Sequence, residues 1–100
     1  MITPKQFKAT PAALATVYTV TANQKGIVKA LTIANPVAAP CNFTLTVFGI
    51  AVYTTRTLGP FESFQCPAAI NQIGLPGDTI TVTPSAAVNV LGSSLETPAT

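Results

Sequence analysis

The sequence predicts an all-β fold, and three observations support this prediction. Short alternations of apolar and polar residues recur along the chain, separated by turn residues at intervals of about ten. Threonine, whose branched side chain fits a pleated sheet, occurs sixteen times. No segment keeps the apolar period of a helix, about 3.6 residues. We therefore expect a single antiparallel β-sandwich, jelly-roll-like or immunoglobulin-like, with about seven to eight strands.

The chain is expected to begin with an extended N-terminal arm over residues 1–12, followed by the sandwich domain over residues 13–100. Pro4 and Pro11 prevent a regular helix in the arm. Phe7 lies between Lys5 and Lys8, and an aromatic residue in an arm usually anchors it to a surface, either that of its own domain or that of a neighbour. Because the domain is small, we favour a neighbouring subunit as that surface.

The strands are expected in order along the domain. In the first, Tyr18 and Val20 share one face. In the second, Ile27 and Leu31 share a face, and Lys29 breaks the pattern, which marks it as a strand-end or interface residue. Phenylalanines in the later strands are expected to pack in the core. The expected strands are residues 14–21, 27–34, 42–50, 52–58, 61–66, 79–83 and 87–91, followed by a loosely held tail that adds at most one short strand.

The segment LPGDTITVT is expected to form a turn that leads into a core strand. Pro76 presets φ for the first central position, and Gly77 supplies the positive φ of a type II turn. Asp78 can then accept hydrogen bonds from nearby backbone N–H groups. We predict a structural role for this acid, although an acid beside Pro-Gly also suits a catalytic or metal site.

Cys41 and Cys66 allow two interpretations. They are small buried thiols in reduced form, or they form a disulfide between neighbouring strands. Synthesis in a cytoplasm favours the reduced form.

The titratable residues argue against an enzyme and against a metal or cofactor. The chain has no histidine and only three acids, of which Glu96 falls in the expected tail. Ser-His and Cys-His nucleophile pairs are therefore excluded, and a calcium site lacks the carboxylates it needs. We expect no catalytic residues, no cofactor and no metal.

Charge and hydropathy limit the partners. Charged residues make up 8% of the chain, against about 25% in a typical soluble domain, so much of the surface is expected to be buried against other chains. The five cations are scattered, which argues against nucleic acid. No segment reaches the roughly 20 apolar residues of a membrane helix, and the N-terminus lacks the pattern of a signal peptide. The chain is expected to stay in the cytoplasm in which it is made.

Four segments carry a resemblance to small virion proteins of tailed bacteriophages. They are YTVTANQKGIVKALTIAN, FTLTVFG, LGPFESFQCP and LPGDTITVTPSAAVNV, within residues 16–90. The resemblance implies an all-β structural protein of the phage particle, synthesised in the bacterial host and located in the virion. It implies a head decoration (cement) protein, or a neck or tail component, and carries over no catalytic residues.

We expect a decoration protein that stabilises the lattice of the major capsid protein as a homo-oligomer, with a trimer as the first choice. Two alternatives stay open: a ring or adaptor component of the neck or tail, and a carbohydrate-binding module for host attachment. The residues expected to contact the partner are Lys5, Phe7, Lys8 and Lys29.

Overall fold

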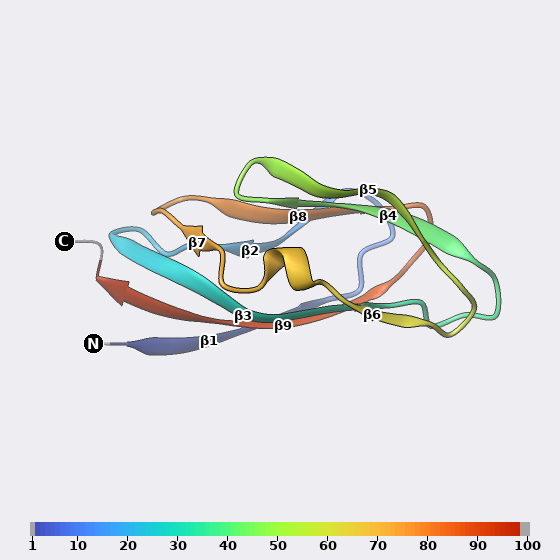
Figure 1. The fold of residues 1–100 in the computed structure, drawn as a ribbon, viewed down its shortest axis with the longest axis horizontal. Helices are drawn as coiled ribbons and strands as arrows, with labels where there is room; N and C mark the ends of the chain where they lie inside the picture. Colours follow the sequence, from blue (N-terminus) through green and yellow to red (C-terminus); the bar gives the residue numbers. More distant parts are fainter. Residues whose placement is uncertain (1, 99–100) are drawn as a thin grey trace.

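Strands form where threonine alternates with apolar residues, and the computed structural model describes residues 2–98. These residues form nine strands and one short 3₁₀ turn, η1, and none of them lies in an α-helix (Figure 1). The prediction of an all-β fold is confirmed. The strands and the turn are β1 (Thr3–Ala9), β2 (Ala15–Thr19), β3 (Gln24–Ala34), β4 (Cys41–Val47), β5 (Ile50–Leu58), β6 (Ser63–Gln65), η1 (Pro67–Ala69), β7 (Ile73–Gly74), β8 (Thr79–Pro84) and β9 (Asn89–Pro98).

The strands form two antiparallel sheets that lie in two layers (Figure 1). The first, called here the β9 sheet, has the order β1-β9-β3-β6, and β7 also pairs with β3. The second, the β8 sheet, has the order β2-β8-β4-β5. The molecule is elongated, with extents of 46 × 20 × 19 Å. Sequential strands mostly alternate between the sheets, so both layers depend on residues from the whole length of the chain.

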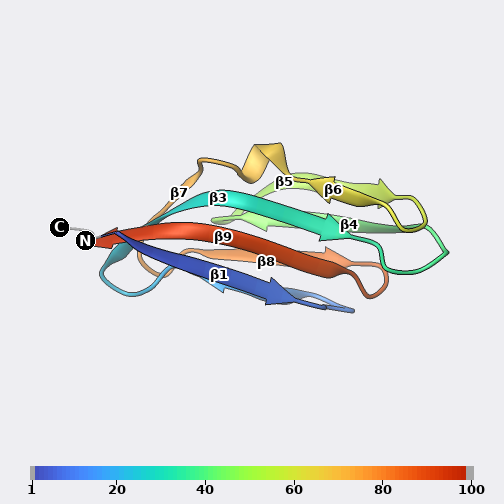
Figure 2. The ribbon, with the colours of Figure 1, turned by 90° about the horizontal axis from the view of Figure 1, so that it is seen from below.

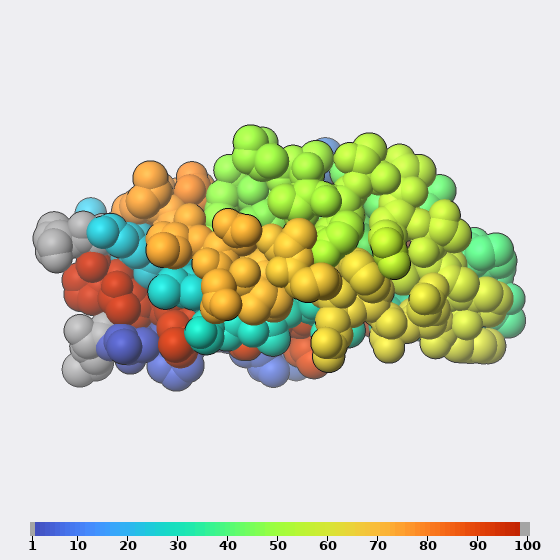
Figure 3. Space-filling view, viewed as in Figure 1, coloured from blue at the N-terminus to red at the C-terminus, as the bar shows by residue number. Residues whose placement is uncertain are grey.

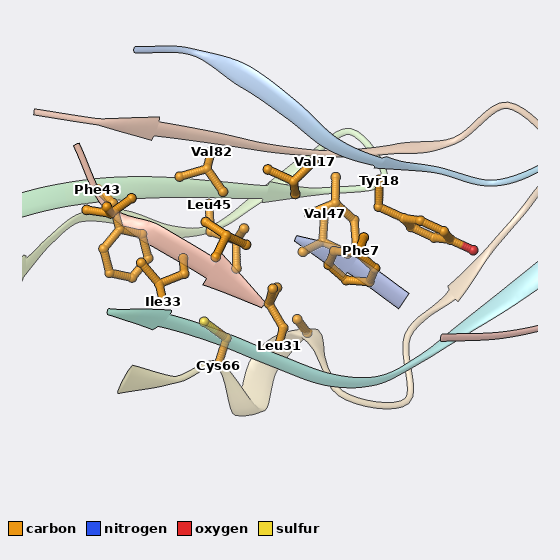
Figure 4. Packing of buried hydrophobic residues seen from close by; sticks show 14 of the residues in the cluster. Phe7, Val17, Tyr18, Leu31, Ile33, Phe43, Leu45, Val47, Cys66 and Val82 are labelled. Atoms are coloured by element: carbon orange, nitrogen blue, oxygen red, sulfur yellow. The ribbon is translucent and has the colours of Figure 1, made fainter. Parts of the chain in front are cut away.

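The core lies between the layers and is built from the alternate residues of each strand that point inward (Figure 4). β4 gives the clearest case, because Phe43, Leu45 and Val47 are buried while the residues between them are only partly covered. In β8, which was expected as a core strand over residues 79–83, Ile80 and Val82 are fully buried. Along one side, the segment that carries η1 and β7 runs between the two sheets (Figures 1 and 3).

β3 differs from the prediction because it contains a bulge. The register with β9 shifts between Val28 and Ala30, so one extra residue, Lys29, interrupts the alternation. The bulge turns Val28 and Leu31 inward together and leaves Lys29 exposed. The expectation that Ile27 shares a face with Leu31 is therefore wrong, and Ile27 lies on the outer face.

The expectation of an extended N-terminal arm outside the sandwich is wrong over residues 3–9. This segment is β1, and it pairs antiparallel with β9 from Thr3↔Glu96 to Ala9↔Val90 (Figure 2). Phe7 is buried against the protein's own core, where it stacks on Tyr18 with ring centroids 5.0 Å apart (Figure 4). The aromatic anchor of this segment is therefore its own domain.

The expectation of a loose C-terminal tail is also wrong. β9 continues to Pro98 and lies between β1 and β3 in the middle of its sheet. Its inward positions after Val90 are Gly92, Ser94 and Glu96, which carry no apolar side chain. Because the apolar alternation stops at Val90, the sequence pattern alone ends the strand too early.

A two-residue turn separates β4 from β5, where the sequence predicted a strand through residue 50. Phe48 and Gly49 both have positive φ, 52° and 90°, as in a type I′ hairpin. The Phe48 ring covers Gly74, where an added Cβ would lie 2.6 Å from the ring. Phe48 is thus partly buried from a turn instead of from a strand.

Candidate functional site

The turn at LPGDTITVT has the predicted form. Gly77 has a φ of 85°, and Asp78 N donates to Leu75 O at 3.0 Å. The Asp78 carboxylate accepts from Leu75 N at 2.9 Å, which closes the turn a second time. This acid holds the start of β8, as predicted from Pro76, Gly77 and Asp78.

Glu62 closes a second turn in the same way. Glu62 N donates to Gly59 O at 3.1 Å, and its carboxylate accepts from Gly59 N at 2.6 Å. The residue in the position of Gly77 is Phe61, with a φ of 56° and 68% of its surface exposed. The prediction that Phe61 packs in the core is wrong, because the turn points its side chain into solvent.

Buried Asn35 ties this turn to the loop after β3. Its Nδ2 donates to Ala39 O at 2.7 Å and to Gly59 O at 3.0 Å, and its Oδ1 accepts from Val37 N at 3.2 Å. Asn35 N also donates to Glu62 O. One side chain therefore fixes both loops at this end of the molecule, and all of its polar atoms are used.

Glu96 is the acid that the sequence reading missed, and it is the most buried of the three. It is 1% exposed, and its carboxylate accepts from Tyr18 Oη at 2.5 Å and from Thr21 N at 3.3 Å. Nearby Ser94 Oγ is buried without a hydrogen-bond partner. The signal available in the sequence was the placement of Ser94 and Glu96 two residues apart, in phase with Val90.

The pKa values of the pair reflect this environment. Burial, together with the hydrogen bond to Glu96, raises the pKa of Tyr18 to about 12. Burial acts to raise the pKa of Glu96, but hydrogen bonds from Tyr18 and Thr21 and the charge of Lys5 hold it below its usual range. At neutral pH the pair is therefore an ionised carboxylate bound by a neutral phenol.

Two glycines make room for the aromatic rings beside Glu96. A Cβ on Gly92 would lie 2.3 Å from the Phe7 ring, and a Cβ on Gly26 would lie 2.7 Å from Tyr18 Oη. Phe7 and Tyr18 thus fill space that any larger residue would take. Packing and hydrogen bonding within the cluster of Phe7, Tyr18, Ser94 and Glu96 hold the inner faces of β1 and β9 against β2.

Cys41 and Cys66 are both buried free thiols, so the disulfide interpretation is not borne out. Burial raises the pKa of Cys66 to about 12 and raises that of Cys41. A thiol held protonated in this way is a poor nucleophile.

The four residues expected to contact a partner do not lie together. Phe7 is in the core. Lys5 has the same strand phase and its charge acts on Glu96, but its side chain is exposed. Lys8 and Lys29 are exposed on the outer side of the β9 sheet, where Lys29 Nζ donates to Asn71 Oδ1 at 3.3 Å. The structure therefore buries Phe7 and leaves the three lysines of this set exposed.

We call the outer surface of β1, β9, β3 and β7 the lysine face, and Figure 2 shows how these strands are arranged. This face carries lysines and apolar side chains. Its lysines are Lys8, Lys25 and Lys29, all exposed. None of the three acids lies on it, because Glu62 and Asp78 sit in turns and Glu96 is internal. A hollow of about 440 Å³ on this face has Ala30, Thr32 and Leu91 among its lining residues.

The outer surface of the β8 sheet is different, and we call it the threonine face. Paired positions across the sheet bring threonines side by side, as in Thr44↔Thr83 and Thr46↔Thr81. None of the residues that form this face is charged. Its threonines are Thr16, Thr19, Thr44, Thr46, Thr57, Thr79, Thr81 and Thr83.

Metal binding, membrane insertion and carboxylate chemistry each depend on groups that can be located in the described residues. Residues 2–98 contain no cluster of three or more histidine, cysteine, aspartate or glutamate side chains that would hold a metal ion. Within the same residues, no helix has the length and apolar character needed to cross a membrane. Each carboxylate already accepts hydrogen bonds from the protein's own groups.

Comparison of the chain with protein-family models finds no match, and comparisons with curated proteins and with solved structures find none either.

Proposed function

We propose that the chain is a non-enzymatic structural protein of a tailed-bacteriophage particle, and that it decorates and stabilises the lattice of the major capsid protein. The observation that carries the proposal is the surface: one broad face is uncharged, and the other combines lysines with exposed apolar side chains. Exposed apolar area of this kind marks protein contacts. The resemblance of residues 16–90 to small phage virion proteins supplies the class of particle.

We further propose that the fold is a β-sandwich of the jelly-roll type. β6 and β7 both pair with β3 and occupy one edge, so they count as one interrupted strand. When β6 and β7 are counted together as strand 6, β8 becomes strand 7 and β9 becomes strand 8. The sheets then have the orders 1-8-3-6 and 2-7-4-5, in which successive strands cross between layers as in two Greek keys. Viral capsid domains use this architecture, and lectins use it too, so it supports the proposal without deciding it.

The test is the presence and copy number of the chain in purified virions. A decoration protein is expected in several hundred copies, whereas a neck or tail ring holds on the order of a dozen by its closed symmetry. Quantitative mass spectrometry of intact particles separates the two, and absence from virions contradicts both. The homo-oligomer, with a trimer as first choice, is checked by light scattering of the purified protein.

A carbohydrate-binding module remains the second candidate. Such a site needs exposed aromatic rings, and Phe61 is the aromatic among the exposed large apolar residues of the described chain. A single ring at a turn provides little stacking surface. Binding on a glycan panel, lost in Phe61→Ala, would favour this candidate over the capsid.

A further inference from the structure

We propose that the lysine face docks onto an acidic protein surface, namely that of the capsid subunit; this inference rests on the proposed function and names the side of the molecule that makes the contact. An apolar row crosses the face. Pro4 pairs with Leu95, Leu95 with Ile27, and Ile27 with Ile73, so the row spans four strands. The solvent side of an antiparallel sheet is normally polar.

The exposure of this face matches a contact surface. Ile73 is 59% exposed and Leu91 is 53% exposed, although both lie in strands. Between the larger side chains, Ala30, Thr32 and Ser93 form the floor of the 440 Å³ hollow. An apolar ridge of a partner would fill this hollow and cover the row, which removes apolar surface from water.

Charge selects the kind of partner. Lys8, Lys25 and Lys29 surround the row, and no side-chain carboxylate of residues 2–98 lies on the face to neutralise them. Two copies meeting through this face would bring like charges together, which is unfavourable. A partner with carboxylates around an apolar ridge is complementary, and such complementarity speeds association and fixes register.

The same residues disfavour two other anionic partners. Membrane-surface segments insert aromatic or large apolar side chains below a basic face, and the lysine face has no aromatic residue and is recessed at its centre. Single-stranded nucleic acid binds where aromatic rings or arginines stack on bases, and this face presents neither. A folded acidic protein is the partner that the surface fits.

The experiment measures co-sedimentation of the purified chain with shells of the phage that encodes it. The double variant Lys8→Glu/Lys25→Glu and the single variant Leu91→Ser alter the lysine face. The matched control is Thr44→Glu/Thr83→Glu on the threonine face, where both positions lie on the solvent side of strands. Circular dichroism melting confirms that each variant folds.

We expect the lysine-face variants to bind about tenfold or more weakly, and the threonine-face control to bind as the unaltered chain does. Raising the salt concentration should weaken binding of the unaltered chain, because exposed charges are screened. If the unaltered chain does not sediment with shells, the proposed function is overturned. If it sediments but only the threonine-face control loses binding, the function stands and this inference is wrong. Binding to phosphatidylglycerol vesicles in place of shells would identify a membrane as the partner and overturn both.

Discussion

Glu96 loses its water on folding and is compensated by two hydrogen bonds from the protein. Tyr18 and Thr21 both donate to Oε2, and the amide oxygen of a glutamine can take that place. Glutamine nevertheless removes the charge and turns the other carboxylate oxygen into a buried NH2 donor that needs an acceptor. We expect Glu96→Gln to lower the free energy of unfolding by about 1–3 kcal/mol, the usual cost of an unsatisfied buried polar group. Urea denaturation at neutral pH measures this.

The control for Glu96→Gln is Glu62→Gln. Glu62 is exposed, and glutamine retains the oxygen that accepts from Gly59 N. This change should alter stability by less than about 0.5 kcal/mol. Equal losses in the two variants would show that burial of Glu96 has no special energetic role.

Gly92 is required because the Phe7 ring lies where a Cβ would be. Gly92→Ala should therefore destabilise the protein by about 1–3 kcal/mol through overpacking. The matched test is the double variant Gly92→Ala/Phe7→Leu, in which the smaller side chain makes room for the new methyl group. If the double variant loses as much as the sum of both single changes, the two residues are not coupled and the explanation is wrong.

Single residues were predictable where local chemistry determines them. Pro76, Gly77 and Asp78 form a turn from their own backbone preferences and hydrogen bonds, and the structure has that turn. Glu96 was not predictable, because its partner Tyr18 is 78 positions away in the sequence. From the sequence alone, a carboxylate without a local hydrogen-bond partner is predicted to be exposed, because the donor that binds it comes from a distant segment.

At the level of elements, the turns at residues 59–62 and 75–78 share one hydrogen-bond pattern but differ at the third position. Phe61 carries a side chain at positive φ, which costs on the order of 1 kcal/mol relative to glycine. Phe61→Gly should therefore raise the free energy of unfolding by about 1 kcal/mol, since the ring is mostly exposed. Gly77→Val makes the opposite change and should lower it by about 1–3 kcal/mol. Thermal unfolding of both variants checks the signs, and a loss in Phe61→Gly would show that the ring stabilises the fold.

β1 is held at an edge by its ladder with β9 and by one buried aromatic residue. Deleting residues 2–10 should lower the free energy of unfolding by more than about 3 kcal/mol, because removal of a buried phenylalanine alone costs about that much. Lys8→Ala, an exposed change in the same strand, should cost less than about 0.5 kcal/mol. If the deletion variant melts at the same temperature as the unaltered chain, β1 does not stabilise the sandwich and behaves as an arm outside it.

Strands were predicted best where apolar alternation is unbroken. β4 and β8 overlap the strands predicted over residues 42–50 and 79–83, because every second residue is apolar and buried. β3 and β9 departed from the prediction for different reasons, a bulge at Lys29 and small or polar inward residues after Val90. Both departures follow from tertiary pairing, which a local pattern does not contain.

For the whole molecule, the sequence predicted the class and the scarcity of charge but not the distribution of charge. Five cations look scattered along the chain. Pairing of β1, β9 and β3 brings Lys8, Lys25 and Lys29 onto one surface. The threonine face of the β8 sheet has no charged residue, because exposed Arg56 of β5 is in register with the inward residue Phe43 and lies over the Phe64 ring. This asymmetry depends on strand order, which is set by contacts between distant segments.

The stability of the whole molecule should depend on pH through its buried groups. The pKa of Glu96 is lowered on folding. Its contribution to the free energy of unfolding is therefore present above pH 4.5, the ordinary value, and is lost as the pH falls below it. The pKa of Tyr18 is raised from 10.0 to about 12, and that of Cys66 from 9.0 to about 12. Their contributions are therefore complete below pH 9.0 and decline as the pH rises toward 12.

We accordingly expect the free energy of unfolding to be constant between pH 4.5, the ordinary pKa of a glutamate, and pH 9.0, and to fall on both sides of this range. Urea midpoints measured across this range define the profile. Tyr18→Phe should flatten the alkaline decline between pH 10 and 12, because phenylalanine cannot ionise in either state. Cys66→Ala should flatten the part that begins near pH 9.0. A decline of unchanged slope in both variants would show that the buried phenol and thiol have no part in alkaline unfolding.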